Sequence, residues 1–243
     1  MANIFEQYGI KEVADVTIYK IGKDGSTTPF LFLDTLKVST LEQTAEQSDA
    51  RGGKGNPKLI SWDYGKEINV TLEDALYSPQ SMALMWGGDK AIWEESKTIE
   101  KMLKYTPDTD SIENTITDGL GKTWTVQGYL EEDGTYKEGT PETVTAGKTY
   151  TLKVSTTASV GNKLVIGADD FPGTYKLVGD TYARNRDTGE DEYFQFVINR
   201  AKMSAEQTLT LEAEGDPTTF NLNMTVLRPQ SGNMIELIQY SIA

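Results

Sequence analysis

Residues 36–74 read LKVSTLEQTAEQSDARGGKGNPKLISWDYGKEINVTLED, and this stretch decides the fold class. Near its end, Ile68, Val70 and Leu72 alternate with polar residues, so the apolar side chains of an extended chain all face one side. Leu36 starts the same two-residue period at the other end of the stretch. The pattern predicts two long strands, each with one face on a core and the other in water.

A polar segment from Glu42 to Lys58 lies between these two strands. Its glycines, charges and Pro57 disfavour a regular core element, so we expect a flexible loop. Gly52-Gly53-Lys54-Gly55 has the glycines and the lysine of a phosphate-binding loop, but the full spacing of a Walker motif is missing. A loop that becomes ordered on assembly is the preferred interpretation.

Hairpin patterns also occur near both ends of the chain. The segment from Val16 to Ile21 alternates, a glycine-rich turn follows at residues 22–26, and Phe30 to Leu33 is apolar. Residues 208–227 alternate on both sides of a Gly-Asp-Pro turn and predict a second hairpin. The last segment, Met234 to Ile242, is suited to a strand that closes the sheet or is exchanged with another copy.

One short helix is expected after the long strands. Ser78 is a good N-cap residue and Pro79 a good first helical residue. The apolar segment from Met82 to Trp86 follows, and Gly87 ends it. We predict a helix of about two to three turns whose apolar side chains pack in the core.

The middle of the chain has a less regular pattern, with strands expected at Trp124–Leu130 and Tyr150–Val154. We predict a mainly β fold of the sandwich or barrel type, with long β-hairpins, one short α-helix and an inserted β-rich lobe. A length of 243 residues fits one large β domain or two small ones. The expected division gives residues 1–95 and 164–243 to the core and residues 96–163 to the lobe.

Composition excludes several kinds of chemistry. The chain contains no Cys and no His, which removes disulfides, thiol nucleophiles, zinc-finger ligands and imidazole acid–base catalysis. The 37 Asp and Glu residues provide oxygen ligands, but the acidic group at Asp187, Glu190, Asp191 and Glu192 lacks the spacing of an EF-hand loop. We therefore predict no enzymatic activity, no cofactor and no metal site.

The formal net charge of −14 disfavours an extended surface that binds nucleic acid tightly. It suits a surface past which DNA slides without sticking. The longest apolar runs fall far short of the ~20 residues that cross a bilayer, and the N-terminus has no secretory pattern. We expect synthesis in the cytoplasm and no insertion into a membrane.

Several motifs are similar to those of the tail tube proteins of tailed bacteriophages. In the C-terminal third these are DDFPGTY at 169–175, FQFVI at 194–198 and LEAEGDP at 211–217. In the first half they are the strand and loop at 36–56 and VTLEDAL at 70–76. The middle lobe has no counterpart in this resemblance.

The resemblance implies a virion protein whose subunits form stacked rings, commonly hexameric, around a channel that conducts the genome during ejection. Its partners would be copies of itself, other tail proteins, and genomic DNA that passes through the lumen without specific binding. The N-terminal arm and the loop at 46–58 would contact adjacent rings. The residues expected at contacts between subunits or rings are Ile4, Phe5, Asp49, Arg51, Lys54, Asn56, Lys58, Ile238 and Tyr240.

Three other functions compete with this interpretation. Another phage part, such as a tail completion protein or a capsid-decoration protein, is the nearest competitor. An extracellular β-sandwich binding module would be a stable monomer with an aromatic groove and usually an export signal. A glycosidase would need a close pair of carboxylates in a cleft, and no spacing in the sequence favours one.

Overall fold

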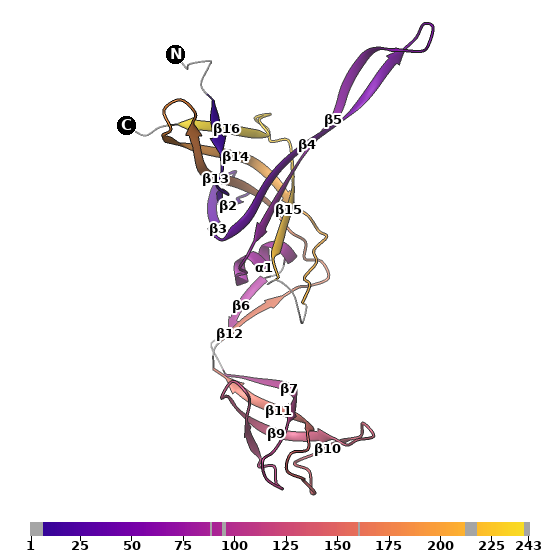
Figure 1. Cartoon of the computed structure of the whole chain (residues 1–243), viewed down its shortest axis with the longest axis vertical. Coiled ribbons are helices and arrows are strands. Elements are labelled where there is room, and N and C mark those ends of the chain that lie inside the picture. Colours follow the sequence, from indigo (N-terminus) through magenta and orange to yellow (C-terminus); the bar gives the residue numbers. More distant parts are fainter. Residues whose placement is uncertain (1–6, 88, 94–95, 160, 212–217, 241–243) are drawn as a thin grey trace. The chain divides into compact units, whose positions relative to one another are not determined.

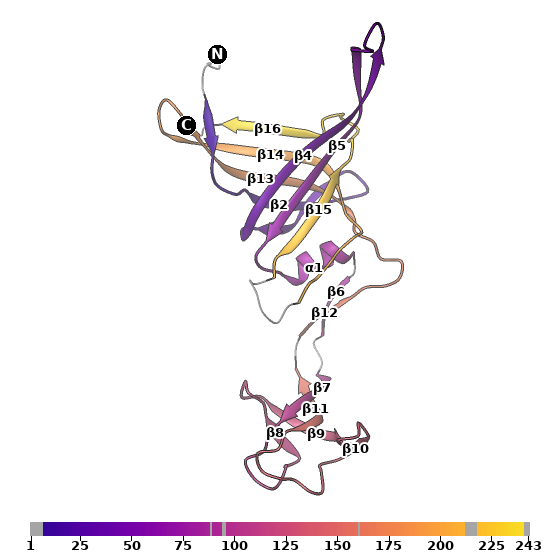
Figure 2. The same ribbon diagram turned by 45° about the vertical axis from the view of Figure 1, so that its right-hand side comes forward.

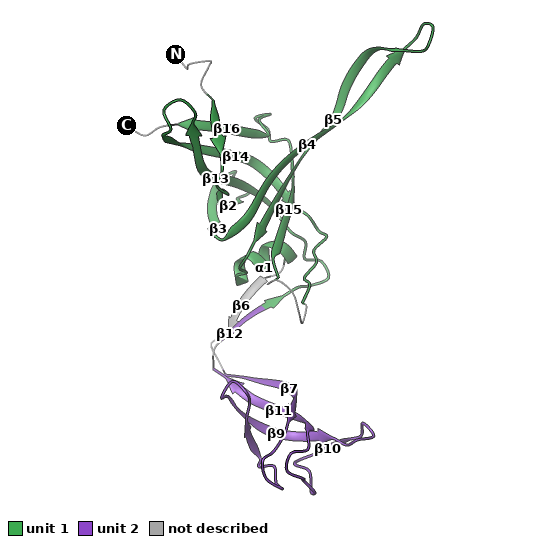
Figure 3. Cartoon of the chain, viewed as in Figure 1, with its two compact units in different colours: residues 1–90, 164–243 green, residues 91–163 purple. Residues whose placement is uncertain are grey.

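The chain forms two compact units, shown in different colours in Figure 3. Unit 1 contains residues 1–90 and 164–243, and unit 2 contains residues 91–163. The structure is a computed structural model, and the residues that it describes are 7–87, 89–93, 96–159, 161–211 and 218–240.

Unit 1 is built on one large antiparallel sheet (Figures 1 and 2). The strand order is β3-β2-β13-β14-β15-β5-β4, with β1 also paired to β13 and β16 to β14. The mainly β fold predicted from the sequence is confirmed. The strands are Tyr8–Ile10 (β1), Asp15–Ile21 (β2), Thr27–Leu33 (β3), Leu36–Arg51 (β4), Lys58–Asp74 (β5), Thr174–Asn185 (β13), Asp191–Met203 (β14), Phe220–Val226 (β15) and Ile235–Tyr240 (β16). Two further strands, Asp89–Trp93 (β6) and Gly161–Val165 (β12), pair with each other.

The predicted opening hairpin forms as β2 and β3. Val16 pairs with Leu33 and Ile21 with Thr27. The turn between them is closed by Asp24, whose carboxylate accepts hydrogen bonds from the backbone N–H and the hydroxyl of Ser26 at 3.0 and 2.6 Å. Such local bonds favour a tight turn over other backbone conformations.

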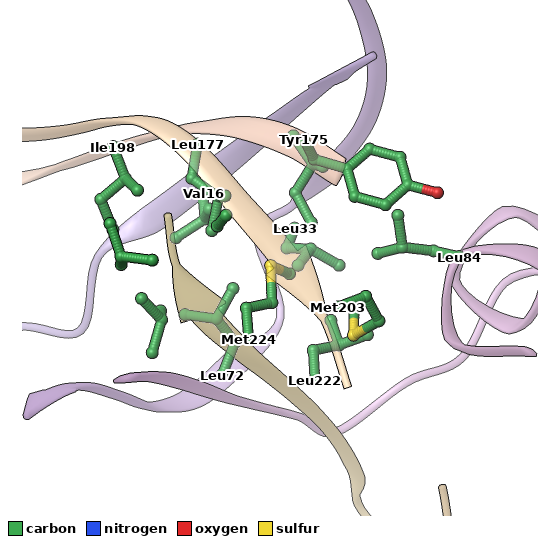
Figure 4. Packing of buried hydrophobic residues seen from close by; sticks show 14 of the residues in the cluster. Val16, Leu33, Leu72, Leu84, Tyr175, Leu177, Ile198, Met203, Leu222 and Met224 are labelled. Carbon is green, nitrogen blue, oxygen red and sulfur yellow. The ribbon is translucent and has the colours of Figure 1, made fainter. Parts of the chain in front are cut away.

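A single apolar core lies between two parts of this sheet, which together make a β-sandwich (Figure 4). Alternate residues of β2, β13 and β14 form one wall of the core, and alternate residues of β5 and β15 form the other. Each fully buried Leu, Ile or Val contributes about 1.5–3 kcal/mol relative to an exposed one. The fully buried side chains at the centre are Val16, Ile18, Val70, Leu72, Leu177, Ile198 and Leu222.

The predicted helix is α1, Pro79–Trp86, and it packs against the same core. Ser78 accepts a hydrogen bond from the N–H of Ser81 at 3.0 Å, and the hydroxyl of Ser81 accepts one from the N–H of Ser78 at 2.7 Å. Gly87 ends the helix at φ +73°. Leu84 enters the core (Figure 4). No helix in the described part of the chain is long and apolar enough to cross a bilayer.

The hairpin predicted at residues 208–227 is wrong in its first half. Residues 204–211 contain no strand, and residues 212–217 lie outside the described part of the chain. Strand β15 pairs instead with β5 along Phe220–Thr225 and with β14 along Met224–Val226. One edge of β15 is therefore paired from Phe220 to Thr225, and the other edge is paired from Met224 to Val226. The partners of β15 are thus β5 and β14, and the alternating segment at residues 208–211 is not one of them.

Unit 2 has its own sheet and its own core. The sheet order is β10-β9-β11-β7, with β8 also paired to β9. The strands predicted near Trp124 and Tyr150 are confirmed as β9 and β11. The strands are Lys97–Tyr105 (β7), Thr115–Thr117 (β8), Thr123–Leu130 (β9), Tyr136–Glu138 (β10) and Tyr150–Ala158 (β11). The core residues are Ile112, Ile116, Val126, Val144, Leu152 and Val154.

Asp118 organises one end of unit 2. One carboxylate oxygen accepts hydrogen bonds from the N–H groups of Leu120 and Lys122 at 3.0 Å each. The other accepts one from the indole of Trp124 at 2.8 Å and lies 3.3 Å from the ammonium of Lys101. The bond from Lys122 is the largest of the causes that lower the pKa of Asp118 from 3.8 to about 2, even though burial opposes the shift.

Candidate functional site

Strands β4 and β5 continue far beyond the core as a two-stranded hairpin, which we call the arm, residues 42–67 (Figures 1 and 2). The flexible loop predicted from Glu42 to Lys58 is wrong for most of its length. Residues 42–51 belong to β4, and only residues 52–57 form the turn. These polar strands form without a buried core, because the N–H and C=O groups of each strand pair with those of the other, as at Gln47 and Asp63.

Three residues with positive φ close the turn at the end of the arm. Gly53 and Gly55 have φ of +82° and +84°, and Asn56 has φ of +51°. Gly and Asn adopt this conformation more readily than other residues. The N–H of Gly52 donates to the carbonyl of Pro57 at 3.2 Å. The glycines thus serve the turn geometry.

A bulge at Gly65 changes which face of β5 each side chain occupies. Thr44 pairs with Glu67 and Glu46 with Tyr64, so β5 has one residue more than β4 between these pairs. Gly65 lies in this bulge with φ +60°. Because one extra residue reverses the alternation, Tyr64 lies on the face of Glu67 and not on the face of buried Ile68.

Apolar side chains beyond the bulge form an uncovered line on one face of the arm. Ile60, Trp62 and Tyr64 follow one another at every second position, which places them on the same face. Their exposed fractions are 53%, 55% and 53%. Ile60 pairs with Ala50 and Trp62 with Ser48, which are too small to cover them, and Tyr64 pairs with Glu46. We call Ile60, Trp62 and Tyr64 the arm stripe.

The end of the arm has a cluster of charges. Asp49 lies 3.1 Å from the guanidinium of Arg51 and 2.8 Å from the ammonium of Lys58. The hydrogen bond from Lys58 is the main cause that lowers the pKa of Asp49. Lys54 and Asn56 are exposed in the adjoining turn. Two cations therefore contact one carboxylate at this end, and Lys54 adds a third cation in the adjoining turn.

A second exposed apolar surface lies on the outer face of the sheet of unit 1. Tyr182 of β13, Tyr193 of β14 and Tyr240 of β16 are direct neighbours across the strands. Their ring centroids lie 5.5 Å apart for the first pair and 5.2 Å apart for the second. Ile238 lies two residues from Tyr240 on the same face and is also exposed. We call Tyr182, Tyr193 and Tyr240 the tyrosine row.

Acidic and polar groups border the tyrosine row. On one side, Arg184 donates two hydrogen bonds of 2.7 Å to the carboxylate of Asp191. On the other side, Gln195 donates to Asp180 at 2.6 Å, and Asp180 pairs in register with Asp15 of β2. The Arg184–Asp191 pair brings a cation to the row itself.

A third surface is the outer face of β4, β5 and β15, opposite the core. Two pairs of side chains cross between its strands, Thr71 with Asn223 at 3.1 Å and Thr225 with Asn69 at 3.0 Å. Among the described residues of this face, no Lys or Arg lies between Val38 and Thr44 on β4, between Glu67 and Glu73 on β5, or between Asn221 and Thr225 on β15. Lys202 of β14 pairs with Thr225 at its edge. Its members are Val38, Thr40, Glu42, Thr44, Glu67, Asn69, Thr71, Glu73, Asn221, Asn223 and Thr225.

The acidic loop considered for Ca²⁺ is engaged by other groups. Asp191 is paired with Arg184, and Asp187 lies 3.0 Å from Arg186. The carboxylate of Glu192 accepts a hydrogen bond from Gln239 at 2.7 Å. Across residues 7–87, 96–159, 161–211 and 218–240, no group of three or more acidic side chains is arranged to hold a metal ion.

The residues predicted at contacts fall in separate places. Asp49, Arg51, Lys54, Asn56 and Lys58 gather at the end of the arm, whereas Ile238 and Tyr240 lie on β16. Ile4 and Phe5 lie outside the described part of the chain. Sequence reasoning missed the arm stripe and the other two tyrosines of the row. The period of two at residues 60–64 was visible, but the sequence does not say which apolar faces stay uncovered.

Comparisons with known proteins place this architecture in a family. The model of the YomU/Tube protein family matches residues 8–239, which span both units. The chain is also similar to the tail tube protein of Bacillus phage SPR, with 29% identity over 204 residues that cover 77% of this chain and 72% of the relative. These matches confirm the resemblance to phage tail tube proteins that the sequence motifs carry, and the chain belongs to the YomU/Tube protein family.

Proposed function

We propose that this chain is a structural subunit of a phage tail tube that polymerises with copies of itself. Its family and its similarity to a protein named tail tube protein support this role. The subunits form rings, hexameric as the resemblance implies, and the rings stack into a tube whose channel conducts the genome during ejection. The subunit is made in the host cytoplasm and resides in the virion tail, where it contacts other tail proteins.

The observation that carries this proposal is the uncovered arm. A hairpin with Ile60, Trp62 and Tyr64 each more than half exposed leaves apolar surface in water. Burying it against a second protein removes that cost, at about 25 cal/mol per Å² of apolar surface. Two-stranded hairpins on their own are also marginally stable, so a partner that holds the arm favours its extended form.

The contacts between subunits or rings involve the end of the arm, strand β16 and the N-terminal residues. The charged end of the arm, including Asp49, Arg51 and Lys58, meets an adjacent ring. Ile238 and Tyr240 of β16 and the N-terminal Ile4 and Phe5 contribute to further contacts.

The outer face of β4, β5 and β15 suits the channel. Threonines, asparagines and three glutamates cover the part of it between Val38 and Thr44, Glu67 and Glu73, and Asn221 and Thr225, whose described residues include no Lys or Arg. DNA affinity rises with the number of cations placed against phosphates, so DNA passes such a face without specific binding. The subunit works through assembly and performs no chemical reaction.

Electron microscopy of the purified chain at several concentrations, together with light scattering, tests the assembly. We expect rings or hollow tubes of uniform diameter. The variant I60S/W62S/Y64S should assemble poorly because it lacks the arm stripe. The matched control Q47S/D63S changes the opposite face of the same hairpin and should assemble normally. Monomers at every concentration contradict self-association of this chain.

The absence of cysteine in the chain allows a test of the channel. In the variant Thr71→Cys, the single thiol lies on the outer face of β5. We expect assembled tubes to react there with a small maleimide but not with a large polymer-linked maleimide. The unassembled chain serves as the control and should react with both. Equal reaction of assembled tubes with the large reagent would place this face away from the lumen.

A further inference from the structure

We propose that the arm of one copy docks on the tyrosine row of a second copy, so that the arm stripe covers Tyr182, Tyr193 and Tyr240. This inference rests on the proposed self-association and names the two surfaces that meet. The occupant of the tyrosine row is thus a defined segment of this same chain, residues 46–64.

Both surfaces are apolar and both are uncovered in a single chain. The stripe residues are more than half exposed, and so is Tyr182 at 53%. In Figures 1 and 2 the end of the arm extends away from the end of β16 that bears Tyr240. One copy therefore leaves its own tyrosine row open to the arm of another.

The two surfaces also match in length. Side chains on one face of a strand repeat every two residues, so the stripe from Ile60 to Tyr64 extends over roughly 13 Å. Three neighbouring strands are about 4.8 Å apart, so the row from Tyr182 to Tyr240 extends over roughly 10 Å. Aromatic side chains such as Trp62 and the tyrosines bury large areas and commonly anchor interfaces.

The charges complement each other. The end of the arm, residues 49–58, carries Arg51, Lys54 and Lys58 against the carboxylate of Asp49, whereas the acidic Glu46 and Asp63 lie farther from the turn. The face with the tyrosine row carries the mutually paired Arg184 and Asp191. It also carries Asp180 and, in the neighbouring register positions, Asp15 and Glu236, so these acidic groups outnumber that cation. In a chain with a formal charge of −14, two copies repel each other in general. A cationic arm end directs the attraction to one acidic surface.

A contact between two different surfaces has a consequence for assembly. Each copy offers one arm and one tyrosine row, so every copy can bind one neighbour through each. Such head-to-tail contacts generate closed rings or continuing stacks rather than isolated dimers. The proposed pairing is thus compatible with a tube.

Crosslinking between two variants tests the pairing without removing either surface. Ser48→Cys places a thiol beside Trp62, and Gln195→Cys places one beside Tyr193, in a chain without other thiols. The Gln195→Cys chain carries a size tag, the two chains are mixed under assembly conditions, and a short bis-maleimide is added. We expect a crosslinked product of mixed size. The matched control Gln47→Cys lies on the opposite face of the arm and should give much less of it.

The possible outcomes separate this inference from the proposed function. Rings or tubes that form without the Ser48–Gln195 product overturn the docking while self-association stands. Chains that stay monomeric overturn both.

An exchange of charges provides a second measurement. Lys54→Glu and Asp180→Lys should each weaken association by about two- to fivefold at low salt, as expected for exposed ion pairs. The chain with both changes should recover most of the loss, because the attraction is restored in reverse. Additive losses in the double variant would contradict the pairing.

Discussion

Gly179 has no Cβ atom, and this absence allows two strands to pack closely. It lies on buried β13 opposite Phe196 of β14, and a Cβ at this position would overlap the phenyl ring. The ring of Phe196 thus lies directly over the backbone of its neighbour. Gly87 is constrained in a similar way, since its φ is +73° and a Cβ would overlap the backbone of Phe171.

We predict that Gly179→Ala lowers the free energy of unfolding of unit 1 by about 1–3 kcal/mol, the usual cost of overpacking a core. Urea unfolding followed by circular dichroism measures this change. Gly9→Ala is the matched control, because Gly9 lies on a strand of the same sheet and a Cβ there meets nothing within 4 Å. Equal stability of the two variants would show that Phe196 moves aside without cost.

A second prediction concerns Asp118. Its pKa is about 2 in the folded chain instead of 3.8, so its contribution to stability is fully present above about pH 4 and is lost as the pH falls through about 2. Asp118→Asn should flatten this part of the pH dependence. Thermal melting of unit 2, followed by the NMR signal of the Trp124 indole, measures it between pH 2 and pH 6. An unchanged pH profile in the variant would exclude this role.

At the scale of elements, the features that depend on local side-chain chemistry, such as caps and turns, could be predicted from the sequence. The N-cap of α1 at Ser78 and the turn at Asp24 both follow from side chains that bond to nearby backbone groups. Residues 42–51 were mistaken for a loop because this part of β4 is polar on both faces and lacks the alternation that a buried face produces. The candidate site depends on which surfaces remain uncovered. The strand order decides this, and local sequence does not give the strand order, as the pairing of β15 with β5 and β14 shows.

The bulge in the arm leads to a third prediction. Gly65→Val places a β-branched residue at φ +60°, which costs of the order of 1–3 kcal/mol locally. If the bulge shifts or disappears, the arm stripe turns away from its face. We therefore expect strongly reduced assembly by light scattering, with little change in the thermal melting of unit 1, because the bulge lies outside the core. Lys66→Ala is the control, and equal assembly of both variants would argue against a role for the bulge.

At the scale of the whole molecule, the two units have separate cores. The hydrophobic core cluster of unit 1 draws on segments both before and after unit 2, whereas the described cluster of unit 2 lies between residues 112 and 154. Strands β6 and β12 pair with each other where the chain passes between the units. The chain therefore leaves unit 1 and returns to it at one place.

This arrangement predicts that unit 1 folds without unit 2. Replacing residues 94–160 by a short Gly-Ser linker should leave one calorimetric transition that matches a transition of the full chain. The intact chain with Leu152→Ala is the control, because this change in the core of unit 2 should lower only the other transition, by about 2–5 kcal/mol in free energy of unfolding. Loss of all cooperative melting in the shortened chain would show that unit 1 needs unit 2.

The positions of β1 and β16 bring both ends of the described chain to the same end of the β13–β14 hairpin. Tyr8 pairs with Asn185, and Tyr240 pairs with Tyr193. A fluorescent protein or affinity tag joined directly to Tyr8 or Tyr240 would therefore lie next to the tyrosine row and crowd it. A tag inserted in the turn at Glu131–Gly134 would instead sit on a unit with its own core. For imaging or for cargo display, the internal turn is the better attachment point, although the termini are the conventional choice.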